Sequence, residues 1–257
     1  MDRSDIRLPG VTKAKQKNEN AIIVGTNEFD LKTNQEESIQ KMCRSNKNSA
    51  VILLNGSPVD MSAWIEGCPA IIEAWYPGEQ GAQAITEIIF GETNPSGKLP
   101  ITFPRSVGQL PLFYSAKPSG RGHGYVENDG SPLYPFGYGL SYTTFEMGEI
   151  THTLEDNSLT VTLPVTNTGD MDGAEVVQVY LTGTNCDVVM PCLELKAYRR
   201  AEVKAGETAT VTLTVPAEAF FYYDRKMNLG MHNGDYTVSV GASSADLRGS
   251  IQVKVRD

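Results

Sequence analysis

The first hundred residues combine continuous apolar runs with amphipathic stretches. Residues 20–25 (NAIIVG), 49–59 (SAVILLNGSPV) and 69–78 (PAIIEAWYPG) each hold an apolar run that is typical of a strand buried on both faces. Residues 34–46 and 79–91 follow a helical period instead, and the second of these stretches ends at a glycine suited to a helix C-cap. Strands that alternate with helices predict a parallel sheet with covered faces.

From about residue 155 the period changes to two. Residues 158–170 (SLTVTLPVTNTGD), 174–183 (AEVVQVYLTG), 207–216 (ETATVTLTVP) and 235–244 (DYTVSVGASS) alternate apolar with polar positions and end in turn residues. This pattern favours a small antiparallel sandwich of the immunoglobulin or fibronectin type.

These patterns divide the chain into three predicted parts. Residues 1–104 are expected to form a partial, flavodoxin-like α/β domain, and residues 151–257 the fibronectin III-like sandwich. Residues 105–150 are rich in Gly, Pro and Tyr and follow neither period, which predicts an ordered connector rather than a free linker. Because residues 1–19 give no strand, we expect the parallel sheet to be incomplete on its N-terminal side.

Composition and charge exclude several classes of function. The 257 residues carry a formal net charge of −9, which argues against nucleic acid or an anionic membrane as partner. No apolar run is long enough to cross a bilayer, and residues 1–10 lack the apolar core of a secretory signal. We therefore expect a cytoplasmic protein of bacterial origin.

Neither the cysteines nor the known motifs predict a cofactor or a metal. The four cysteines, at positions 43, 68, 186 and 192, form no CxxC pair and are too few and too irregular for a zinc site or a disulfide scaffold. Cys186 and Cys192 are close enough in sequence to bridge in an oxidising compartment, but reduced thiols are the expectation. Nucleotide-binding and metalloprotease motifs are absent from the sequence.

Several long motifs carry a resemblance to one known family. Residues 55–61 (NGSPVDM), 71–106 (IIEAWYPGEQGAQAITEIIFGETNPSGKLPITFPRS) and 132–146 (PLYPFGYGLSYTTFE), in this order, resemble the C-terminal half of glycoside hydrolase family 3. Residues 165–181 and 194–216 resemble the fibronectin type III-like terminal domain of the same family. The resemblance implies a β-glucosidase or β-xylosidase, with the PSGKLP and GYGLSY segments serving architecture rather than chemistry.

The resemblance also implies a retaining mechanism, which needs two carboxyl groups. In the family, the nucleophile is an Asp on a preceding (β/α)8 barrel, and the general acid/base is usually a Glu in the α/β domain. Glu28 is the candidate by position, although the Asp-Arg and Leu-Pro-Gly expected near it stand at residues 2–10 instead. An exposed loop carboxylate is the competing interpretation of Glu28.

Other residues are candidates for contact with a sugar. Trp75 and Tyr76 follow a predicted strand, where open sheets place ligands, and core packing is the alternative. Arg121 and His123 lie in a glycine-rich loop that would border a cleft, unless they are ordinary surface residues. Glu73 lies within an apolar run and could be a buried, paired carboxylate.

Three hypotheses follow from the sequence. The chain is part of a glycosidase that acts on β-linked oligosaccharides, it is a non-catalytic carbohydrate-binding or interaction module, or it is an inactive fragment with an exposed sheet edge. The first hypothesis requires the missing barrel domain or a second copy of the chain as partner, and it predicts no turnover by these 257 residues alone. The third predicts self-association.

Overall fold

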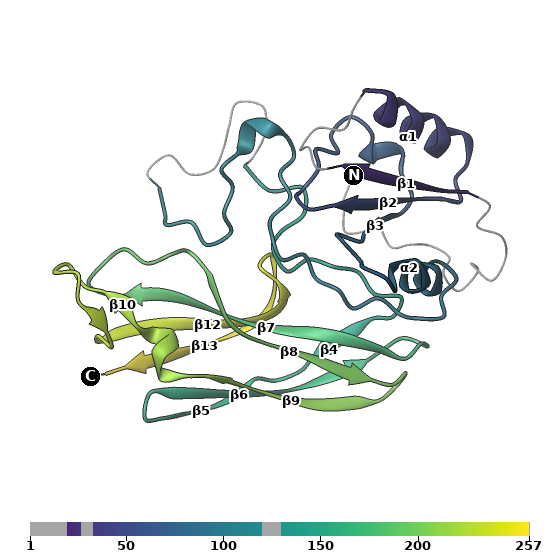
Figure 1. Cartoon of the computed structure of the whole chain (residues 1–257). Coiled ribbons are helices and arrows are strands. Elements are labelled where there is room, and N and C mark those ends of the chain that lie inside the picture. The colour runs from purple at the N-terminus through teal and green to yellow at the C-terminus, as the bar shows by residue number, and fades with distance from the viewer. Residues whose placement is uncertain (1–19, 27–32, 120–129, 257) are drawn as a thin grey trace. The chain divides into compact units, whose positions relative to one another are not determined.

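The computed structural model describes residues 20–26, 33–119 and 130–256, which belong to two compact units (Figure 1). The first unit takes in the chain up to Pro95 together with Phe103–Pro111, and the second contains Ser96–Thr102 and the chain from Leu112 onward. The PSGKLP motif is therefore divided, because most of it lies in the same unit as the sandwich. The domain boundaries drawn from the sequence stay a prediction.

The first unit is built on a three-stranded parallel sheet with the order β1-β2-β3. Strand β1 spans Asn20–Thr26, β2 spans Ser49–Asn55, and β3 covers only Ile71–Glu73. Central strand β2 is buried on both faces, as its continuous apolar run predicts, and Val51, Ile52 and Leu53 are at most 2% exposed. The parallel α/β fold expected from the sequence is confirmed.

The described part of the first unit also contains two α-helices, one on each side of this sheet. Helix α1 spans Thr33–Ser45 and α2 spans Gly81–Ile89, and Figure 1 shows them on opposite sides of the strands. Ile39 and Cys43 form the buried face of α1. Helix α2 ends two residues before Gly91, which takes the left-handed conformation expected of a C-terminal glycine. Short 3-10 turns lie at Ile65–Gly67 (η3) and Val107–Gln109 (η4).

The second unit is a sandwich of two antiparallel sheets. One sheet has the order β13-β12-β7-β8; in the other, β6 pairs with β9 along one edge and with β4 and β5 along the other. In chain order, the strands are β4 (Phe145–Met147), β5 (Thr151–Glu155), β6 (Ser158–Asn167), β7 (Gly173–Asn185), β8 (Glu194–Val203), β9 (Thr208–Val215), β12 (Gly234–Ser243) and β13 (Asp246–Val255). The turn Ala217–Phe220 (η5) and a small hairpin of β10 (Tyr222–Tyr223) with β11 (Leu229–Gly230) join β9 to β12.

One hydrophobic core fills the space between these sheets. Every second residue of β6 is buried, so that Leu159, Val161, Leu163 and Val165 point inward and are at most 1% exposed. Valines and leucines of β7, β9 and β12 meet them in the same cluster. The alternating pattern seen in the sequence therefore reflects one face in the core and one in solvent, as in fibronectin-type sandwiches.

The two glycine-rich motifs of the family resemblance pair with each other inside the second unit. The Leu99 N–H donates to the Tyr138 carbonyl and the Gly137 N–H donates to the Leu99 carbonyl, both at 2.8 Å. Lys98 Nζ donates to the Gly139 carbonyl at 3.1 Å and lies 2.9 Å from the buried Glu175 Oε1 of β7. These contacts give both motifs the architectural role that the resemblance implies.

Candidate active site

Two polar residues end neighbouring parallel strands of the first unit. Asn55 is the last residue of β2 and is fully buried, and Glu73 is the last residue of β3. The register pairs Glu73 with Leu53, so both side chains belong to the carboxyl edge of the sheet. Open α/β sheets bind ligands at this edge.

Glu73 is a partly buried carboxyl group with one oxygen unsatisfied. Its Oε1 accepts a hydrogen bond from the Trp75 N–H at 3.1 Å, whereas the buried Oε2 has no partner within the described residues. Burial raises the pKa of Glu73 to about 7, against the opposing effects of the Trp75 N–H and the Asn55 side chain. The sequence raised the possibility of a buried, paired carboxylate; the described part of the chain supplies no ion-pair partner for it.

Asn55 also has a buried side-chain oxygen without a hydrogen-bond donor among the described residues. Its Nδ2 donates to the Ser57 carbonyl at 2.7 Å, and its buried Oδ1 receives no hydrogen bond from the described residues. Two neighbouring side chains therefore each present an acceptor that lacks a donor. Burial alone raises the pKa of Glu73, because the Asn55 side chain acts in the opposite direction.

The two predicted aromatic residues follow directly after Glu73. Trp75 has a φ of 51°, a conformation that costs energy for an aromatic residue, and its ring meets that of buried Phe103 edge-on at 6.1 Å. Tyr76 is 69% exposed, and its ring lies against Gly56, where an added Cβ would come within 2.6 Å of the Tyr76 hydroxyl oxygen. The structure thus gives Trp75 a packing role, while Tyr76 presents much of its surface to solvent.

The left-handed turn at Trp75 also explains why β3 is short. The sequence predicts a strand within residues 69–78, but pairing ends at Glu73 because the chain turns there. Asn55 and Gly56 belong to the NGSPVDM motif of the family resemblance, but neither is among the site residues predicted from the sequence. The signal for them was present, since an Asn-Gly pair directly follows the buried run of β2.

For three other predicted site residues the structure gives no position. Glu28, Arg121 and His123 lie outside the described residues. Their roles as acid/base and sugar contacts stay predictions.

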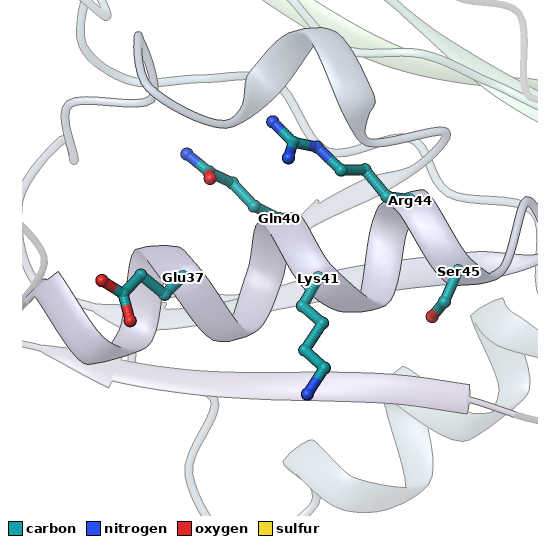
Figure 2. A pocket seen from close by; sticks show the side chains of 5 residues that line it. All are labelled: Glu37, Gln40, Lys41, Arg44 and Ser45. Atoms are coloured by element: carbon teal, nitrogen blue, oxygen red, sulfur yellow. The ribbon is translucent and has the colours of Figure 1, made fainter.

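A separate shallow hollow runs along α1 and is wide open to solvent. Figure 2 shows that its lining side chains all come from this one helix, with Gln40 and Arg44 on one side and Lys41 on the other. The full lining set is Glu37, Gln40, Lys41, Arg44 and Ser45. Flexible side chains of both charges fan outward here, and no polar groups converge, so the hollow is not a binding site by its chemistry.

Neither a metal centre nor a membrane helix appears in the part of the chain that the structure describes. No three His, Cys, Asp or Glu side chains gather there in a way that could hold a metal ion. Among the same residues, no helix is long and apolar enough to cross a membrane.

Comparison with protein families gives two matches. The model of the glycosyl hydrolase family 3 C-terminal domain matches residues 2–142, and that of the fibronectin type III-like domain matches residues 175–244. Similar curated proteins include a periplasmic beta-glucosidase of Salmonella typhimurium, 36% identical over 228 residues, and a beta-xylosidase of Formosa agariphila, 38% identical over 225 residues. These alignments cover 83% and 84% of this chain but only 30% and 31% of the two relatives.

Solved structures agree with these matches. The beta-glucosidase of Listeria innocua in complex with glucose superposes with a TM-score of 0.82 at 29% identity, over 93% of this chain and 37% of that one. A beta-glucosidase of Erythrobacter marinus gives a TM-score of 0.83 at 33% identity. The chain belongs to glycosyl hydrolase family 3, and it carries the C-terminal α/β domain and the fibronectin type III-like domain of that family.

Proposed function

We propose that this chain forms the C-terminal part of a retaining β-glycosidase that releases terminal β-linked glucose or xylose. Family membership supports the reaction class, and relatives named beta-glucosidase and beta-xylosidase support the two sugars. The chain spans about 30% of the length of these relatives, so the activity belongs to a larger assembly of domains.

The observation that carries the proposal is the edge formed by Asn55, Glu73, Trp75 and Tyr76. Aromatic rings suit the apolar faces of pyranose sugars, and neighbouring polar groups suit their hydroxyls. Tyr76 offers the exposed ring, while Trp75, fixed by Glu73 and Phe103, holds the turn that presents it. This edge would form one wall of the sugar cleft.

The chemistry would be shared between this chain and a barrel domain. A retaining mechanism places two carboxyl groups about 5 to 5.5 Å apart, one as nucleophile and one as acid/base. The strands described here form a three-stranded parallel sheet and a sandwich, but no barrel to carry the nucleophile. Glu28 is the proposed acid/base, and the chain by itself is expected to leave aryl β-glucosides intact.

A chimera tests the proposal. The chain would replace the corresponding C-terminal part of the Formosa beta-xylosidase, and hydrolysis of aryl β-xylosides and β-glucosides would be measured. We expect an active chimera, a fall in kcat of at least about 100-fold for Glu28→Gln, and a rise in KM of roughly 3- to 10-fold for Tyr76→Ala. Tyr198→Ala is the matched control, because Tyr198 is 71% exposed on β8 of the other unit.

Two results would contradict the proposal. One is hydrolysis by the isolated chain that Glu28→Gln abolishes, because both carboxyl groups would then lie within this sequence. The other is an active chimera in which Tyr76→Ala changes KM no more than Tyr198→Ala does.

The exposed ring of Tyr76 also supports the second hypothesis, a non-catalytic carbohydrate-binding module. Calorimetric titration of the isolated chain with cellobiose and with soluble β-glucan distinguishes the two. Saturable binding that Tyr76→Ala abolishes, together with a chimera that binds but does not hydrolyse, would favour the module.

A further inference from the structure

Two cysteines that are distant in sequence meet in the interior of the first unit. Cys43 lies in the last turns of α1, and Cys68 directly follows the 3-10 turn η3. Their sulfur atoms are 2.7 Å apart, and the two residues are 4% and 8% exposed. No sequence pattern predicts this pair, because neither a CxxC spacing nor a common element connects the two cysteines.

A second contact ties the same helix to the same loop. Gln40 lies one turn before Cys43, and its Nε2 donates to the Ala63 carbonyl at 2.8 Å. This loop joins β2 to β3, beginning at Gly56 under the Tyr76 ring and reaching Cys68 before β3 starts. The hydrogen bond from Gln40 to the loop therefore helps to keep the two sulfur atoms together, in addition to their own contact.

Two other common roles of paired thiols find no support among the described residues around them. A zinc site needs four ligands, and within the described chain no third His, Cys, Asp or Glu joins this pair. A catalytic thiol needs a lowered pKa and access to solvent, whereas burial raises the pKa of the Cys68 thiol. What remains is a buried dithiol whose sulfurs face each other.

We propose that Cys43 and Cys68 are an oxidisable pair that closes into a disulfide and fastens α1 to the loop between β2 and β3. The oxidant is a low-molecular-weight disulfide such as glutathione disulfide. One protein thiol loses its proton and attacks this disulfide, which releases one small thiol. The second protein thiol then displaces the other small thiol from the mixed disulfide, so the protein loses two hydrogens while the small disulfide becomes two thiols.

Burial sets when the bridge forms. Exchange requires a thiolate that the oxidant can reach. In the folded chain both thiols at this site are buried, which disfavours the thiolate and blocks the oxidant. The bridge therefore forms while the chain folds and is slow to form or break afterwards.

The test refolds the full chain in a glutathione redox buffer, traps free thiols with iodoacetamide under denaturing conditions, and identifies linked peptides by mass spectrometry. We expect a peptide pair containing Cys43 and Cys68, two hydrogens lighter than its reduced form, while Cys186 and Cys192 are alkylated. Cys186→Ser should leave this linked pair unchanged, and Cys43→Ser should abolish it. Full alkylation of Cys43 and Cys68 in correctly refolded, unaltered chain would overturn the proposal.

Stability of the unaltered chain gives a second readout. Tryptophan fluorescence follows the first unit, since Trp64 and Trp75 are the two tryptophans of the sequence. Reduction of the refolded chain should lower its urea midpoint by roughly 1 to 2 M. The Cys43→Ala/Cys68→Ala variant should show one midpoint with and without reductant. Equal midpoints for the oxidised and reduced unaltered chain would contradict the bridge.

Discussion

Replacement of Glu73 by glutamine tests the cost of burying a carboxylate at the end of β3. Glutamine keeps an oxygen for the Trp75 N–H and puts an uncharged amide NH2 in place of the buried Oε2, which has no partner within the described residues. The substitution therefore imitates the protonated carboxyl group without the cost of burying a charge. We expect the first unit to become more stable at alkaline pH and to change little in acid.

The pH dependence follows from the direction of the pKa change. Folding raises the pKa of Glu73 from an ordinary 4.5 to about 7, so the folded chain keeps a proton that the unfolded chain releases. The stability linked to this proton is fully present below pH 4.5 and is lost as pH rises through about 7. The full change corresponds to about 3 kcal/mol, and partial exposure of the side chain reduces the expected effect to about 1 to 2 kcal/mol.

Urea unfolding between pH 5 and pH 8, followed by tryptophan fluorescence, measures this effect in the unit that contains both tryptophans. The difference between Glu73→Gln and the unaltered chain should grow with pH to about 1 to 2 kcal/mol. Glu79→Gln is the control, because Glu79 is exposed just beyond the same turn. A constant difference over this pH range, or a less stable glutamine variant at pH 8, would refute the reasoning.

Two further predictions concern the second unit, whose unfolding is followed by far-ultraviolet circular dichroism. Lys98→Met should destabilise it by about 2 to 4 kcal/mol, because Glu175 would be left as a buried charge; the double change Lys98→Met/Glu175→Leu should recover most of that loss, and no recovery would contradict the explanation. Gly139→Ala should cost more than about 2 kcal/mol, because the added Cβ would lie 2.1 Å from the Gly97 carbonyl oxygen. Gly230→Ala, where a Cβ meets nothing within 4 Å, should cost less than about 1 kcal/mol, and equal losses for the two glycine variants would show that the close approach is not the cause.

Much of the fold could be predicted because burial leaves a local signature. Strand β2 is buried on both faces and reads as a continuous apolar run, whereas β6 is buried on one face and alternates. Strand β13 was not predicted, although it alternates around Ile251, Val253 and Val255 in the same way. Its first half is polar and exposed, which weakens the pattern.

The candidate site was predictable only in outline. An aromatic pair after an apolar run predicts a ligand edge, and Trp75 and Tyr76 do follow β3. The left-handed turn at Trp75 and the ring of Tyr76 over Gly56 depend on the register of β3 beside β2. The sequence near these residues does not specify that register.

The sequence by itself determined the alternation of strands and helices in the first unit, the change of period between the two units, and the family, because each of these depends on residues that are close together along the chain. Only the tertiary structure brought Glu73 beside Asn55, Cys43 against Cys68 and Lys98 onto Glu175. Such pairs join elements that are far apart along the chain. They form only when sheet order and packing place those elements together, and no local pattern of polar and apolar residues records that placement.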